Sequence, residues 1–223
     1  MNPQAEELNN TIKKESSVVF ELLSEKGKEI FYPAKGILAQ SADAKGKKIN
    51  ATIGIALEED GSPMRLQSIA KRIDLDPKEI FPYAPSFGNK NLRDIWKEML
   101  SQKNPGLKGK AISTPVVTNA LTHGLSMIGY MFTDKKEKVI LPDQYWGNYK
   151  LIFINAYGAE LEAFETFVGS SFNVAGLKAK LGGSPGKKVV LLNFPNNPTG
   201  YTPTEKEVSE IVTTIKQAAE AGN

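Results

Sequence analysis

Cysteine is absent from the 223 residues, and histidine occurs once, at His123. Without cysteine the chain can form no disulfide, no thiolate metal site and no cysteine nucleophile. A single histidine also argues against a histidine-based zinc site and against a Ser-His-Asp triad. We therefore predict no metal site, and any catalysis has to come from other residues or from a bound cofactor.

Long apolar runs and strongly basic blocks are also missing. No apolar stretch approaches the roughly 20 residues that a membrane span needs, and the polar, acidic first ten residues do not resemble a signal peptide. The net charge is +3, and no basic block exceeds two adjacent lysines. We therefore expect no nucleic-acid or membrane partner. A cytoplasmic enzyme fits these features, as do many other soluble proteins.

The second half of the chain alternates β-prone and helical segments. We predict strands at 115–118, 138–141, 160–167 and 189–192, and helices at 126–132, 149–156, 173–181 and 204–221. Such alternation favours βαβ units, and hence a mostly parallel sheet covered by helices. Thr204 and Glu207 are spaced as a capping box for the last helix.

The first half is less regular. We predict a helix at 4–24, loop at 26–48, a short strand at 49–57 and a short helix at 64–73. A strongly amphipathic helix follows residue 88, and its apolar stripe consists of Leu92, Ile95, Trp96, Met99 and Leu100.

The densest cluster of turn residues is Asn193–Gly200, with the sequence Asn-Phe-Pro-Asn-Asn-Pro-Thr-Gly. The Asn197-Pro198 step is by itself a turn signal. The cluster also follows a strand of a predicted α/β sheet, which is where such sheets place ligands. The string resembles the Asn-Pro-Thr-Gly motif of class I/II aminotransferases, which are fold-type-I enzymes dependent on pyridoxal 5'-phosphate (PLP). The resemblance implies that Asn197 binds the phenolic oxygen of the cofactor and also lies in the substrate site.

The family resemblance extends to an anion site after residues 115–118. Strand, tight turn and helix point free backbone N–H groups at an anion. The resemblance assigns the cofactor phosphate to Ala120, Leu121 and Thr122, with Thr122 adding its hydroxyl. Many relatives have a small residue where Leu121 stands. His123 lies beside this cup, and we expect a solvent-exposed residue at a helix start rather than a catalytic base.

Further matches concern the cofactor ring, the substrate and a second subunit. Trp146 matches the aromatic residue that stacks on the pyridine ring, with Tyr145 as the alternative. Tyr83 matches a tyrosine that reaches the cofactor phosphate of the partner subunit, which implies a homodimer. Ile53 and Gly54 match a stretch that faces the substrate.

The resemblance implies a three-layer α/β/α fold, incomplete in this chain, with an N-terminal helix and arm at 1–48 and part of the PLP-binding large domain at 49–223. The family's pyridine-binding aspartate, Schiff-base lysine and carboxylate-binding arginine are not found after Asn197. We therefore assign no catalytic residue, place the lysine outside this chain, and expect a fragment that is inactive alone.

The resemblance implies amino-group transfer between an amino acid and a 2-oxo acid. The same cofactor-binding motifs leave open a lyase, a decarboxylase or an acyl transferase. A non-catalytic derivative of the fold is a further alternative.

Overall fold

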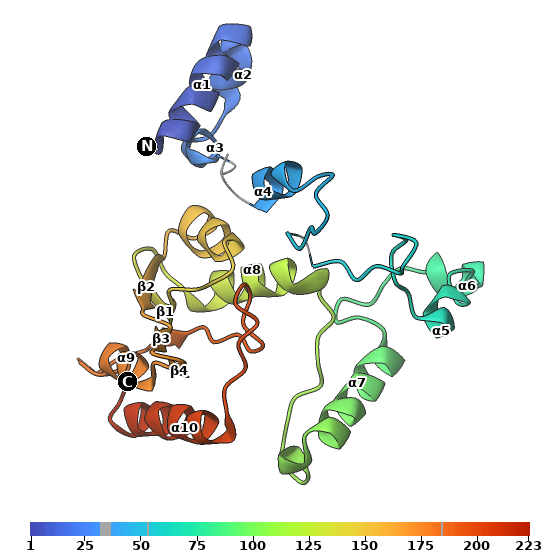
Figure 1. Cartoon of the computed structure of the whole chain (residues 1–223), viewed down its shortest axis with the longest axis vertical. Coiled ribbons are helices and arrows are strands. Elements are labelled where there is room, and N and C mark those ends of the chain that lie inside the picture. The colour runs from blue at the N-terminus through green and yellow to red at the C-terminus, as the bar shows by residue number, and fades with distance from the viewer. Residues whose placement is uncertain (32–36, 53, 184) are drawn as a thin grey trace. The chain divides into compact units, whose positions relative to one another are not determined.

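The computed structural model describes residues 1–31, 37–52, 54–183 and 185–223, and these form two compact units, Met1–Val117 and Thr118–Asn223 (Figure 1). The boundary predicted at residue 48 separates the N-terminal arm from the large domain of the whole protein. The division into these two units does not test it, and it stays a prediction. Within the described ranges, no helix is both long and apolar enough to cross a membrane.

The second unit is built on a parallel sheet of three strands. The strands are β1 (Lys138–Pro142), β2 (Glu160–Phe164) and β5 (Val189–Val190), in the order β2-β1-β5. Lys138 lies opposite Glu160, and Val139 lies opposite Val189. The predicted parallel sheet is therefore confirmed. The predicted strand at 160–167 ends three residues early, and the chain continues into a small hairpin of β3 (Phe167–Val168) and β4 (Ser171–Phe172).

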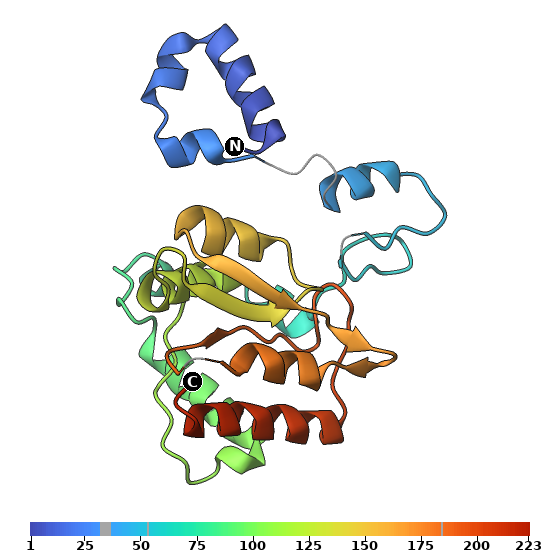
Figure 2. The same ribbon diagram turned by 90° about the vertical axis from the view of Figure 1, so that its left-hand side faces the viewer.

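Helices cover both faces of this sheet, so the unit has three layers (Figure 2). One face carries α8 (Ala120–Phe132) and the π-helix η2 (Lys150–Ala156), and the other carries α9 (Val174–Leu181) and α10 (Glu205–Glu220). Because successive side chains of a strand point to opposite faces, β1 serves two cores. Val139 and Leu141 face the η2 layer, whereas Ile140 faces α9 and α10.

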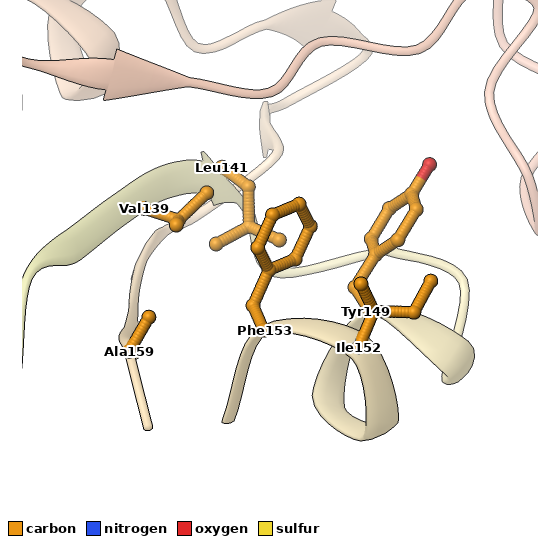
Figure 3. Packing of buried hydrophobic residues seen from close by; sticks show 6 residues of the cluster. All are labelled: Val139, Leu141, Tyr149, Ile152, Phe153 and Ala159. Carbon is orange, nitrogen blue, oxygen red and sulfur yellow. The ribbon is translucent and has the colours of Figure 1, made fainter. Parts of the chain in front are cut away.

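Each face has its own buried cluster. On the η2 side, Figure 3 shows Phe153 lying against Leu141, and the cluster consists of Val139, Leu141, Tyr149, Ile152, Phe153 and Ala159. The opposite cluster consists of Ile140, Phe164, Phe172, Leu177, Leu181 and Ile211. Both clusters lie beneath the loops that follow the strands, and they hold the ends of those loops in place.

The first unit is helical. Its elements are α1 (Pro3–Glu15), α2 (Ser17–Leu22), α3 (Glu25–Glu29), α4 (Ile37–Asp43), α5 (Gln67–Ala70), α6 (Pro77–Ile80), α7 (Lys90–Lys103) and the 3₁₀ turn η1 (Pro105–Leu107). The predicted amphipathic helix is α7. Its first turn is capped by the Asn89 side chain, which accepts from the N–H groups of Asn91 and Leu92.

Two predictions for the N-terminal region were wrong. The helix expected at 4–24 is broken at Ser16, whose extended backbone (φ −158°, ψ 101°) ends α1 while its hydroxyl caps α2 by accepting from the Val19 N–H. The loop expected at 26–48 contains α3 and α4. Ser24 caps α3 through the Gly27 N–H, so a local side-chain cap starts a helix that the weak periodicity had not indicated.

The strands expected at 49–57 and 115–118 are not formed in the described residues. The first region has only an isolated bridge between Leu57 and Pro63. In the second, the Val117 N–H donates to Phe87 O and Pro115 O accepts from Arg93 Nε. Both segments have β-prone side chains, but neither pairs with a neighbouring strand along its length. The helix expected at 64–73 shortens to α5.

Leu177 provides a test of the packing beneath the site. Its side chain is fully buried between α9 and the sheet. We expect Leu177→Ala to lower the free energy of unfolding by about 2–5 kcal/mol, because truncation loses apolar burial and leaves a cavity. Urea titration of the chain measures this change. The control is Val212→Ala on α10, where the side chain is 58% exposed. Equal losses in the two variants would contradict the packing described above.

Candidate functional site

The candidate site lies where the three parallel strands end. After β1 comes the loop Asp143–Trp146, after β2 comes Thr166, and after β5 comes the loop Asn193–Gly200. Because the carboxyl ends of parallel strands meet at one edge, these segments lie together. Hydrogen bonds between side chains and backbone join all three.

Thr166 is the innermost of these connections, with only 2% of its surface exposed. Its hydroxyl donates to Asp143 Oδ1 at 2.6 Å, its N–H donates to the same oxygen at 2.9 Å, and its hydroxyl oxygen accepts from the Gln144 N–H at 3.0 Å. The Thr166 hydroxyl is the main cause that lowers the pKa of Asp143. This bond set fixes the end of β1 to the end of β2.

Asn196 connects the third strand to the same place. Its Nδ2 donates to Gln144 O at 3.0 Å, and its Oδ1 accepts from the Thr199 N–H at 3.1 Å and from the Thr199 hydroxyl at 2.7 Å. Its backbone N–H donates to Tyr201 O, and its carbonyl accepts from the Gly200 N–H. Only 7% of Asn196 is exposed. The loop is therefore folded around this residue.

Asn197, the predicted ligand of the cofactor, has the opposite environment. It is exposed, and across the described ranges no hydrogen bond of its side chain is recorded. An exposed carboxamide beside a rigid loop keeps both its donor and its acceptor available. The position therefore fits a group that must bind the phenolic oxygen of a ligand.

The far end of the asparagine loop is fixed by Glu207 on α10. Its Oε1 accepts from the Phe172 N–H at 2.8 Å and from the Tyr201 hydroxyl at 2.6 Å. Its Oε2 accepts from the N–H and hydroxyl of Thr204, which completes the predicted capping box. These four donors, led by the Tyr201 hydroxyl, lower the pKa of Glu207 from the usual 4.5 to about 2. Burial first, and then Glu207, raises the pKa of Tyr201.

Trp146 and Tyr145, the two candidates for ring stacking, are both half-buried and both touch Tyr149. Trp146 meets the Tyr149 ring edge-to-face at 5.7 Å between centroids, and Tyr145 stacks on it at 6.3 Å. Tyr149 is 5% exposed, and burial raises the pKa of its hydroxyl. Tyr149 therefore contacts both aromatic candidates from the buried cluster beneath them. Because both rings contact Tyr149, these contacts do not show which of them stacks on the cofactor ring.

The predicted phosphate cup begins α8. Ala120 has a left-handed backbone (φ 63°), which is uncommon for a residue with a side chain and here turns the chain into the helix. The Ala120 N–H donates to Thr118 O at 2.9 Å. The N–H groups of Leu121 and Thr122 lie in the first turn, where a helix offers them no carbonyl. These two donors fit an anion.

His123 is exposed, as predicted. Its Nδ1 accepts from the Asn119 N–H at 3.0 Å, which helps to close the turn before α8. The imidazole therefore has a structural part in the loop.

The remaining candidates belong to the first unit. Tyr83 is 97% exposed, which suits a side chain that reaches toward another subunit. Gly88 has φ 91°, and a Cβ there would lie 2.3 Å from Val117 Cγ2, so only glycine fits. Gly54 is exposed, with open space where a Cβ would stand. Ile53, the other predicted substrate contact, lies outside the described residues.

Sequence reasoning missed the residues that build the loops, namely Asp143, Gln144, Thr166, Asn196 and Tyr201. Only Glu207 had a local signal, which is the capping box. Throughout the described ranges, no cluster of three acidic or histidine side chains could hold a metal ion.

The comparisons with known proteins agree on one family. Residues 46–219 match the family described as aminotransferase class I and II. The chain is 26% identical to the cytoplasmic aspartate aminotransferase of Caenorhabditis elegans, covering 85% of this chain and 48% of the relative. It is 31% identical to the cytoplasmic aspartate aminotransferase isozyme 2 of Arabidopsis thaliana, covering 78% and 45%. The chain thus spans about half the length of the curated relatives that it matches.

Solved structures give the same fold. An aminotransferase from Anaerococcus prevotii superposes with a TM-score of 0.75 at 26% identity, covering 89% of this chain and 51% of that one. The cytoplasmic aspartate aminotransferase of Saccharomyces cerevisiae superposes with a TM-score of 0.68 at 22% identity, covering 91% and 50%. The three-layer α/β/α fold is therefore that of the aminotransferase large domain, in part.

The low pKa of Glu207 predicts how stability depends on pH. A carboxylate whose pKa is lower in the folded state stabilises the fold above its unfolded pKa, and it loses this contribution as the pH falls toward the folded value. We expect Glu207→Gln to be less stable than the parent at pH 7. The difference should shrink between about pH 4.5 and pH 2. Urea midpoints measured across this range test the expectation.

Glu210→Gln is the matched control, because Glu210 is an exposed carboxylate on the same helix. Its stability difference from the parent should stay small at every pH. A Glu207→Gln deficit that does not change with pH would contradict the assigned ionisation.

Proposed function

Because the chain belongs to the class I and II aminotransferases, we propose that the whole protein transfers an amino group between an amino acid and a 2-oxo acid, with PLP as the cofactor. The observation that carries the proposal is the Asn-Pro-Thr-Gly loop, which presents the exposed Asn197 at the carboxyl edge of a parallel sheet. Trp146 follows β1 of the same sheet, and α8 directly precedes β1. In our proposal the Trp146 ring contacts the cofactor ring, and the N-terminus of α8 contacts the cofactor phosphate.

PLP, when bound, supplies an electron sink for the carbanion at the substrate α-carbon. In our proposal Asn197 donates a hydrogen bond to the phenolic oxygen and so orients the ring. Trp146 offers a flat face, and such stacking contributes about 0.5–1.5 kcal/mol beyond area burial. The N–H groups of Leu121 and Thr122 hold the phosphate at the positive end of α8, with the Thr122 hydroxyl beside them. Ala120 sets the turn that directs these donors.

The substrate, partner and location are also proposals. Gly54, Ile53 and Asn197 face the substrate, and the proposal names no particular amino acid. Tyr83 completes the phosphate site of a second copy, so the protein is a homodimer. A cytoplasmic location is supported by two relatives that carry this word in their names.

The reaction is tested with the protein as its own cell makes it, loaded with PLP. We expect a stoichiometric amino acid to convert the cofactor into its pyridoxamine form, and a 2-oxo acid to restore it, as followed by absorption spectroscopy. The physical reason is that amino-group transfer leaves the nitrogen on the cofactor. A lyase, decarboxylase or acyl transferase would turn over without accumulating that form. No spectral change with any amino acid would favour a non-catalytic derivative.

The shared site is tested by complementation between two variants of the same full protein. We expect Tyr83→Ala and Asn197→Ala each to be impaired as homodimers. Mixed dimers should regain partial activity, because one of their two sites then has both residues intact. Light scattering checks that each variant remains dimeric. Monomers, or no recovery on mixing, would contradict a site that two chains share.

A further inference from the structure

We propose that Asn196 is a positioning residue for this site, and that its buried amide couples the loop of Trp146 to the loop of Asn197. The inference rests on the proposed function for the ligand that the two loops hold. The coupling between the two loops is argued separately, from hydrogen bonds within residues 143–201. The neighbouring asparagines therefore divide two tasks, because Asn196 builds the loop and Asn197 meets the ligand.

The Asn196 carboxamide makes bonds in two directions. Its Oδ1 binds the N–H and hydroxyl of Thr199, and both bonds stay inside its own loop. Its Nδ2 crosses to Gln144 O at 3.0 Å, two residues before Trp146. The bonds of Oδ1 fix the plane of the amide, and the fixed plane aims Nδ2 at the other loop.

Gln144 is held from its other side as well. Its N–H donates to the Thr166 hydroxyl at 3.0 Å, while its carbonyl accepts from Asn196. Thr166 is 2% exposed and Asn196 is 7% exposed. Gln144 itself is exposed, but its two partners are buried, so water can reach the bonds only from the Gln144 side. A change at the Asn196 amide should be transmitted through Gln144 to the Trp146 ring.

Asn197 offers a matched comparison. It is the next residue, it has the same side chain, and it is exposed without a recorded side-chain hydrogen bond in the described part of the chain. Replacing either asparagine by aspartate keeps the shape and adds the same charge. Only Asn196→Asp puts an oxygen in place of the donor that faces Gln144 O. A difference between the two variants therefore reports the coupling and not the added charge.

The experiment uses the full 223-residue chain. Trp96 and Trp146 are its two tryptophans, so Trp96→Phe leaves Trp146 as the single fluorescent reporter. Without any ligand, we expect Asn196→Asp to shift the Trp146 emission and lower its anisotropy. We expect Asn197→Asp to leave both unchanged. Far-UV circular dichroism confirms that each variant is folded at the temperature used.

A second measurement adds PLP and follows the quenching of Trp146. We expect Asn196→Asp to weaken PLP binding by roughly 2- to 12-fold, the factor for one net hydrogen bond. Asn197→Asp should weaken binding as well, but without the change in ligand-free emission. If the parent chain shows no quenching, the proposed cofactor site fails, while the ligand-free measurement still decides the coupling.

Two outcomes would overturn the inference. One is an Asn196→Asp chain that is less stable but has unchanged Trp146 emission, which would make the residue merely structural. The other is an equal emission shift in both asparagine variants. If Asn196→Asp does not fold, Thr199→Val takes its place, because it removes one bond that orients the amide. A shift of the Trp146 emission in folded Thr199→Val supports the coupling, and unchanged emission contradicts it.

Discussion

The site depends on the side-chain hydrogen bonds that hold the loops after β1, β2 and β5, beyond the last paired residues of these strands. The paired register of β1 with β2 reaches to Pro142, and the Asp143 N–H adds one last backbone bond, to Phe164 O at 2.8 Å. Thr166 and Asn196 take over this role by binding the N–H and the carbonyl of Gln144. Two side-chain bonds to one residue thus extend the order of the sheet into the loops. In our proposal these bonds couple the position of Trp146 to that of Asn197.

The polar groups of the site are either buried and hydrogen-bonded within the protein or exposed and available to a ligand. This division follows from their access to water. Buried polar atoms need partners, because an unpaired buried donor or acceptor costs about 1–3 kcal/mol. Thr166, Asn196 and Glu207 are buried, and each makes several hydrogen bonds. A group that binds a ligand must instead keep its bonding capacity free, which requires contact with water. Asn197 and the first-turn amides of α8 meet this condition.

The sequence predicted well what depends on neighbouring residues. β1, α7 and α10 appear where periodicity and caps placed them, and the Asn-Pro-Thr-Gly string located the asparagine loop. The bonds of Thr166 to Asp143 and of Asn196 to Gln144 join residues 23 and 52 positions apart. No local pattern encodes such pairs. The strand expected at 115–118 failed for a related reason, because β-propensity describes side chains and cannot supply a partner strand.

Most of the apolar face of α10 is exposed, yet the asparagine loop beside this helix is ordered. Its periodic apolar residues are Val208, Ile211, Val212 and Ile215, yet only Ile211 is buried, and the exposed fractions of the other three are 46%, 58% and 38%. The helix nevertheless starts at its capping box, and Glu207 still binds Tyr201 at the end of the asparagine loop. The loop is therefore held by polar bonds within residues 143–207 and by the packing of Phe194 and Tyr201 on the buried cluster beneath it. Covering the exposed face of α10 would add stability, but the loop geometry does not require it.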